Sequence, residues 1–91
     1  MITPNNQHAD NQQAGDILSL AQLKMGGRGR VVRVTGTDKV SQRLLEMGIT
    51  PGAEVCLLRA APLGDPLEIE IRGYRLSLRR SEAEKIDMET R

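Results

Sequence analysis

The residues able to perform nucleophilic chemistry are few and far apart in this chain. The only cysteine, Cys56, lies between Val55 and Leu57 in an apolar run, and the only histidine, His8, lies in a polar segment near the N-terminus. Nucleophilic catalysis requires a base within hydrogen-bonding reach of the nucleophile, and this sequence indicates no such pair. A thiol in an apolar run without a neighbouring cation is expected to be buried and inert. We therefore predict no enzyme, no catalytic residue and no cofactor site.

Metal and phosphate sites are weakly indicated as well. Cys56, His8 and the scattered acidic residues lack the spacings that gather ligands around one ion, so we predict no metal site within a single chain. Glu68 and Glu70 share one side of a predicted strand, which an exposed polar face explains. Residues 26–29 (GGRG) combine glycine amides with an arginine, but the strand and helix context of a phosphate loop is missing. We interpret them as a turn.

Charge and composition argue against a nucleic-acid-binding protein. The net charge is only +1, although residues 24–43 hold six basic residues and one acidic residue. Residues 29–34 (GRVVRV) resemble the first strand of ribosomal KOW-type barrels, yet recognition of single strands relies on aromatic stacking, and Tyr74 is the only aromatic residue. We predict no nucleic-acid partner. The acidic C-terminal segment is expected to compensate the basic one if the last strand pairs beside the first main strand.

Length and composition limit the chain to one small domain. It has 91 residues, 38% of them hydrophobic, with no Phe or Trp, so its core must be aliphatic. Residues 1–16 are polar and lack periodicity, which predicts a disordered tail. They do not resemble a signal peptide, and no later window is apolar enough to span a membrane. We expect a cytoplasmic protein without direct membrane insertion, a domain over residues 17–88 and a C-terminal tail over residues 89–91.

The N-terminal half of this domain is predicted to contain two helices and a strand. Ser19 and Gln22 have the spacing of a capping box, which predicts a short helix that ends before residues 26–27 (GG). The β-branched run 30–35 predicts the first main strand. A second helix is predicted where three apolar residues recur on one face. These are Val40, Leu44 and Met47.

The C-terminal half is predicted to contain the remaining strands. Pro and Gly at 51–52 favour a type II turn that leads into a strand over residues 54–59. Alternation over residues 67–72, which resumes at 76–78, predicts a hairpin with one buried face. We place its two-residue turn at Gly73-Tyr74.

Two further elements complete the predicted domain. Ser81 and Glu84 have capping-box spacing for one helical turn. Residues 85–88 alternate and are predicted to form a last edge strand. About five short strands with short helical insertions indicate a mostly β fold, a small and partly open barrel.

Residues 61–66 (APLGDP) form the main candidate contact surface. The two prolines restrict the residues that precede them to extended backbone, so we expect a stiff loop without hydrogen-bonded structure of its own. A stiff loop loses little conformational entropy on docking. The predicted partner-binding residues of this loop are Pro62, Leu63, Gly64, Asp65 and Pro66. The second candidate surface is the polar face of the helix near residue 43, with Gln42, Arg43 and Glu46.

The order of these motifs resembles the FeoA family, the small cytoplasmic component of bacterial ferrous iron uptake. The resemblance covers residues 17–88 and rests on LAQL at 20–23, G-x-V-x-x-V at 29–34, RLLEMGITPG at 43–52, APLGDP at 61–66, RG at 72–73 and LSLR at 76–79. It implies an SH3-like barrel that acts by protein contact. The implied partner is the membrane iron transporter FeoB, contacted through its cytoplasmic GTP-binding domain and modulated by that contact.

A second function stays open at this point. The same domain resembles the C-terminal SH3-like module of iron-dependent repressors of the DtxR family. A free-standing regulatory module that contacts metal-sensing or transcription proteins is therefore the alternative. Because the chain shows no helix-turn-helix and no dimerisation helices, the transport accessory is favoured. A homo-oligomer also stays open, since an exposed edge strand is able to pair with a second copy.

Overall fold

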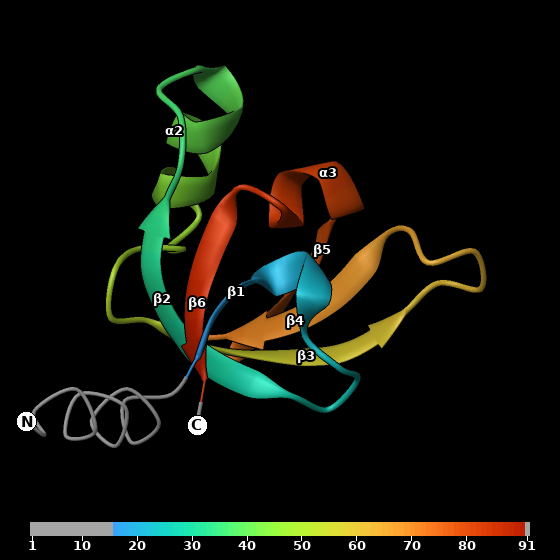
Figure 1. Ribbon diagram of the computed structural model, residues 1–91. Coiled ribbons are helices and arrows are strands. Elements are labelled where there is room, and N and C mark those ends of the chain that lie inside the picture. Colours follow the sequence, from blue (N-terminus) through green and yellow to red (C-terminus); the bar gives the residue numbers. More distant parts are fainter. Residues whose placement is uncertain (1–15, 91) are drawn as a thin grey trace, which may run out of the picture.

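The computed structural model describes residues 16–90 as one curved antiparallel sheet with short helical segments (Figure 1). The strands are β1 (Asp16–Ser19), β2 (Arg28–Val34), β3 (Glu54–Ala60), β4 (Leu67–Ile71), β5 (Tyr74–Leu78) and β6 (Ile86–Thr90). The helical segments are the 3-10 helix η1 (Leu20–Gln22), α2 (Lys39–Glu46) and α3 (Arg80–Ala83). The mostly β fold predicted from the sequence is confirmed.

The sheet has six strands in the order β1-β6-β2-β3-β4-β5, one more than predicted. The additional strand is β1, whose first residue Asp16 pairs with Thr90 of β6. Four residues are too few to reveal an alternating pattern, so this strand was not predicted. Asp16 thus belongs to the sheet and not to the predicted polar tail. The rest of that predicted tail, residues 1–15, lies outside the described residues.

Strand β6 lies inside the sheet, between β1 and β2, so its prediction as an edge strand is wrong. Its apolar residues Ile86 and Met88 are fully buried, and the strand continues to Thr90 rather than ending at residue 88. Strand β6 pairs with β2, which is the arrangement under which the charges of the two segments compensate. It places Arg33 Nε 2.9 Å from Asp87 Oδ2, so the basic and acidic segments compensate each other there.

The core is aliphatic, as the composition requires, and the predicted alternation in β4 is borne out. The buried hydrophobic residues are Leu20, Val31, Leu44, Ile49, Ala53, Val55, Leu57, Leu67, Ile69, Ile71, Leu78, Ala83, Ile86 and Met88. They come from every strand except β1, and from η1, α2 and α3. The predicted turn at residues 50–53 is present: Gly52 has a φ of 92°, and the Ala53 N–H donates to the Thr50 carbonyl at 3.0 Å.

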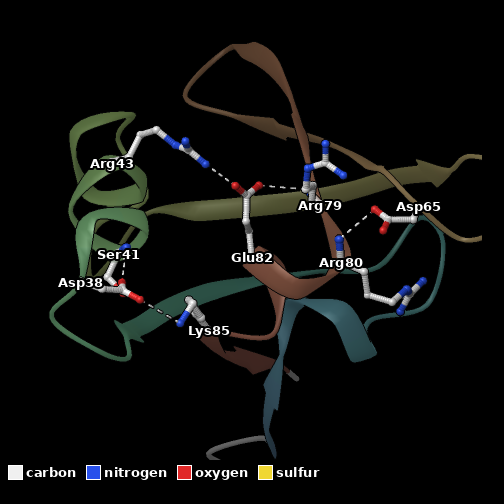
Figure 2. Close-up of polar contacts among 8 residues, drawn as sticks. All are labelled: Asp38, Ser41, Arg43, Asp65, Arg79, Arg80, Glu82 and Lys85. Carbon is white, nitrogen blue, oxygen red and sulfur yellow. Dashed lines mark hydrogen bonds and ion pairs between the residues drawn. The ribbon is translucent and has the colours of Figure 1, made fainter.

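Strands β3 and β4 form a long hairpin, and the loop that joins them projects beyond the rest of the sheet (Figure 1). This loop is the predicted contact segment, residues 61–66. Helix α2 stands over the opposite end of the sheet in the same view. The short helix α3 follows β5 and lies between α2 and the β3–β4 loop (Figure 2).

Candidate functional site

The two candidate surfaces predicted from the sequence meet in one groove. Its lining includes Arg43 and Met47 at the α2 side, Asp65 and Pro66 from the β3–β4 loop, and Arg79 and Glu82 at the start of α3, with the end of β5 between them. The groove has a volume of about 490 Å³. We call it the α2–α3 groove. Three separate segments of the sequence, residues 43–47, 65–66 and 77–82, therefore contribute to a single surface.

Helix α2 is fixed at its N-terminus by a cap that the sequence interpretation missed. The Asp38 carboxylate accepts a hydrogen bond from the Ser41 backbone N–H at 3.0 Å. This bond is the main cause that holds the pKa of Asp38 below its ordinary value, and Lys85, 3.5 Å away, adds to the effect. Ser41 itself is buried, and its hydroxyl donates to the Thr35 carbonyl at 2.6 Å. The start of α2 is thus bonded to Thr35, the residue after β2, and to Lys85, the residue before β6.

The C-terminus of α2 is fixed by the β4–β5 hairpin. The Tyr74 hydroxyl donates to the Met47 carbonyl. Arg72 donates from Nε to the Gly48 carbonyl at 3.2 Å and from Nη2 to Thr50 Oγ1 at 2.9 Å. Gly48 has a φ of 100°, a left-handed conformation that suits glycine at the end of a helix. These contacts explain why carbonyl groups at the end of α2 stay satisfied without a further helical turn.

The hairpin turn lies one residue earlier than predicted. Ile71 pairs with Tyr74, so the two turn residues are Arg72 and Gly73, with φ values of 51° and 86°. Two successive positive φ values are the mark of a type I′ turn, the form that suits a two-residue hairpin. The predicted turn at Gly73-Tyr74 is wrong because Tyr74 belongs to β5, where its hydroxyl reaches α2.

Replacing Tyr74 with phenylalanine is expected to lower the free energy of unfolding by about 0.5–1.5 kcal/mol, because the Met47 carbonyl loses its donor while the ring is kept. Urea denaturation of the two proteins measures this difference. An unchanged free energy of unfolding would show that the hydroxyl does not hold the end of α2.

The helix face predicted as the second candidate surface is only partly directed into the groove. Arg43 reaches across to Glu82 and forms an ion pair with it (Figure 2). Gln42 and Glu46 are exposed but are not part of the groove lining. Of the three predicted residues of this face, Arg43 is therefore the one that the fold brings together with the loop.

The β3–β4 loop presents one strongly exposed apolar side chain. Leu63 is 96% exposed, the largest exposure among the large hydrophobic residues of the described chain. The loop also has hydrogen bonds of its own, contrary to expectation. The Gly64 N–H donates to the Ala61 carbonyl at 2.7 Å, and the Ala61 N–H donates to the Pro66 carbonyl at 3.0 Å. These two hydrogen bonds close the loop. They restrict its backbone in addition to the restriction that the two prolines impose.

Asp65 has a structural contact in addition to its predicted role. Its carboxylate Oδ1 accepts a hydrogen bond from the Arg80 backbone N–H at 2.9 Å, at the first turn of α3 (Figure 2). Glu82 Oε1 accepts from the Arg79 N–H at 2.9 Å. The capping pair is thus Arg79 and Glu82, and the predicted pair Ser81 and Glu84 is displaced by two residues. The helix begins earlier than predicted because a residue distant in the sequence, Asp65 of the loop, accepts the Arg80 backbone N–H.

Arg80 holds the base of the loop, and the sequence interpretation did not single it out. Its Nε donates to the Gly64 carbonyl at 3.0 Å, and its Nη1 donates to the Ala21 carbonyl in η1 at 2.9 Å. The side chain thus connects the contact loop with η1. The sequence alone does not distinguish Arg80 from its neighbour Arg79. The fold shows that Arg80 is the one whose side chain connects the loop with η1.

Cys56 differs from its prediction as a buried thiol. Val55 and Leu57 are buried, and Cys56 between them points to the other face of β3, where it is half-buried. Its Sγ lies 4.0 Å from the Gly26 carbonyl. Among residues 16–90, no group of three or more His, Cys, Asp and Glu side chains is placed to hold a metal ion. No helix of these residues is long and apolar enough to cross a membrane.

Comparison with known proteins identifies relatives over nearly the whole described chain. The sequence model of a family described as FeoA domain matches residues 18–90. A protein of Porphyromonas gingivalis, described as a Fe(2+) transport protein A/Fe(2+) transporter FeoB fusion protein, is 39% identical over 72 residues, which are 79% of this chain. The match spans only 8% of that relative's length.

Two solved structures resemble the fold closely. The solution structure of FeoA from Chlorobium tepidum has a TM-score of 0.75 and 41% identity, and the match covers 80% of this chain and 70% of that chain. The crystal structure of FeoA from Stenotrophomonas maltophilia, complexed with zinc and described as an SH3 domain protein, has a TM-score of 0.71 and 29% identity over 79% of this chain and 89% of that chain. The SH3-like fold implied by the sequence motifs is therefore confirmed.

Proposed function

The chain belongs to the FeoA domain family, and we propose that it is a cytoplasmic accessory protein of ferrous iron uptake that modulates a FeoB-type transporter by direct contact. In this proposal the chain performs no catalysis of its own. The contact is made with the cytoplasmic GTP-binding domain of the transporter. The surface is the β3–β4 loop together with Arg43 at the α2–α3 groove.

The fusion relative supports the choice of partner. Its description names a transport protein A and a FeoB transporter within one polypeptide. Joining two modules covalently raises the effective concentration of one at the other, which is useful when the two associate. A separate chain of the same family is expected to meet the same kind of transporter without the covalent link.

The observation that carries the proposal is Leu63. A leucine that is 96% exposed contributes nothing to the folding of its own chain, and burying it against a partner is favourable by about 1.5–3 kcal/mol. The hydrogen bonds that close the loop keep the side chain presented before the partner arrives. The entropy cost of ordering this segment on binding is therefore small.

The test is a titration of the isotopically labelled full chain with the purified cytoplasmic domain of the FeoB protein from the same organism. We expect amide shifts over residues 61–66 and near Arg43. Replacing Leu63 with serine is expected to weaken the affinity at least about tenfold, which corresponds to about 1.4 kcal/mol. The melting temperature should stay unchanged because Leu63 has no buried contact to lose.

Met25→Ser is the matched control. Met25 is also an exposed apolar residue, at 70%, but it lies in the connection between η1 and β2. Its replacement removes similar apolar surface and should leave the affinity unchanged. Equal weakening by both substitutions, or no binding by the unmodified chain at any nucleotide state of the partner, would contradict the proposed contact.

A further inference from the structure

The carboxylate of Asp65 is directed toward its own chain. Its Oδ1 accepts a hydrogen bond from the Arg80 backbone N–H at 2.9 Å, and Figure 2 shows the side chain pointing from the β3–β4 loop to the start of α3. The first N–H groups of a helix have no acceptor within the helix, so an acceptor from another segment satisfies one of them. A partner that took this oxygen would have to compete with that bond.

The Arg80 side chain returns a bond to the same loop. Its Nε donates to the Gly64 carbonyl at 3.0 Å. The loop carboxylate therefore accepts from the backbone of α3, while a side chain of α3 donates to the backbone of the loop. Two bonds of opposite direction fix residues 64 and 65 against the start of α3.

The direction of Leu63 depends on these bonds. Leu63 is 96% exposed, so its own side chain has no buried contact that would hold it in place. It is separated from Asp65 by Gly64 alone, and Gly64 has a φ of 86°, a region in which glycine moves freely. Local chain stiffness therefore ends at Gly64. The bonds to α3 supply the restraint on the C-terminal side of Leu63.

We propose that Asp65 is a positioning residue of the β3–β4 loop. It does not bind the partner. By accepting from the Arg80 N–H, it holds Leu63 in the direction in which the partner meets it. This inference rests on the proposed function, because it assigns a role within the same contact surface. The role requires an acceptor oxygen at Asp65 and does not require its negative charge.

Two substitutions separate the acceptor from the charge. Asp65→Asn keeps an oxygen that accepts a hydrogen bond and removes the charge, whereas Asp65→Ala removes both. Amide hydrogen exchange is measured first, in the full chain without a partner. We expect Asp65→Ala to speed exchange of the Arg80 and Gly64 amides at least about tenfold, and Asp65→Asn to change it less than about threefold.

The same variants are then titrated with the purified cytoplasmic domain of the FeoB protein. Asp65→Ala is expected to weaken the affinity at least about fivefold, because the loop must be ordered on binding, and Asp65→Asn should stay within about twofold of the unmodified chain. Glu84→Ala is the matched control, since it removes an exposed carboxylate at the other end of α3. It should change neither the exchange of the loop nor the affinity.

Equal weakening of partner binding by Asp65→Asn and Asp65→Ala would overturn the proposal, because it would show that the carboxylate charge contacts the partner. Fast exchange in the asparagine variant would overturn it as well. If the alanine variant does not fold, the asparagine variant decides alone. Unchanged binding then supports positioning by an acceptor, and weakened binding contradicts it.

The exchange measurement does not depend on the transporter. If Asp65→Ala loosens the loop, Asp65→Asn does not, and the FeoB domain fails to bind the unmodified chain, Asp65 positions the loop and the proposed partner is wrong. If the FeoB domain binds through Leu63 while Asp65→Ala changes neither exchange nor affinity, the proposed function stands and the positioning role is wrong.

Discussion

Replacing Arg80 with alanine is expected to lower the free energy of unfolding by about 2–3 kcal/mol. The side chain donates to the carbonyls of Gly64 and Ala21, and both bonds come from a charged donor that is partly buried. Its removal leaves two carbonyl groups without their donor. It also releases the base of the contact loop, so the affinity for the partner should fall together with stability. Chemical denaturation combined with the titration described above measures both effects.

Arg79→Ala supplies the control for this prediction. The neighbouring arginine carries the same charge, but its guanidinium bonds to no described residue. Its removal should change the free energy of unfolding by less than about 0.5 kcal/mol. If the two alanine substitutions destabilise the chain equally, the bridging role of Arg80 is wrong, and the effect belongs to charge alone.

Replacing Gly29 with alanine is expected to cost about 1–3 kcal/mol, because a methyl group does not fit at this position without moving the backbone. A Cβ on Gly29 would lie 2.8 Å from the Glu89 carbonyl oxygen and 3.2 Å from Thr90 Cγ2. Both neighbours belong to β6, which is paired on its two sides and cannot shift alone. Glycine is therefore required here by the close approach of two strands.

Thermal and urea denaturation of the Gly29→Ala chain test this expectation. Arg28→Ala is a suitable control, because Arg28 is the preceding residue of β2 and is exposed. It should stay within about 0.5 kcal/mol of the unmodified chain. A Gly29→Ala chain that is as stable as the control would mean that β2 and β6 separate easily at this point.

Those parts of the fold that depend on a local pattern were predictable from the sequence. The alternation of Leu67, Ile69 and Ile71 identified a strand with one buried face, and all three side chains are buried. The spacing of Val40, Leu44 and Met47 identified a helix here, and α2 spans Lys39–Glu46 with Met47 as its C-cap. In each case the hydrophobic period itself specifies the element and the face that is buried.

The parts that were missed depend on contacts between distant segments. One contact at the N-terminus of α3 comes from Asp65, which lies 15 residues before the Arg80 N–H from which it accepts. The hairpin turn moved by one residue because Tyr74 reaches the end of α2. No local pattern encodes such contacts, since each of them exists only after the sheet has brought the two segments together.

The candidate site shows the same division. The loop between two prolines was predicted to be a contact surface, and its Leu63 is exposed in the structure. The joining of this loop with Arg43 in one groove was not predicted, because the two segments were treated as separate surfaces. Partner binding by the eight residues named from the sequence stays a prediction, and for Asp65 a substitution will also affect the cap of α3.

The bridge made by Arg80 has a consequence for local unfolding. Exposed loop tips usually open on their own, with a much smaller free energy than the whole domain. Here one guanidinium holds carbonyls of both the β3–β4 loop and η1, and Leu20 of η1 is fully buried in the core. We therefore expect the base of the loop to open together with η1. Hydrogen exchange of its amides should then follow that of the core, while the tip around Leu63 exchanges faster.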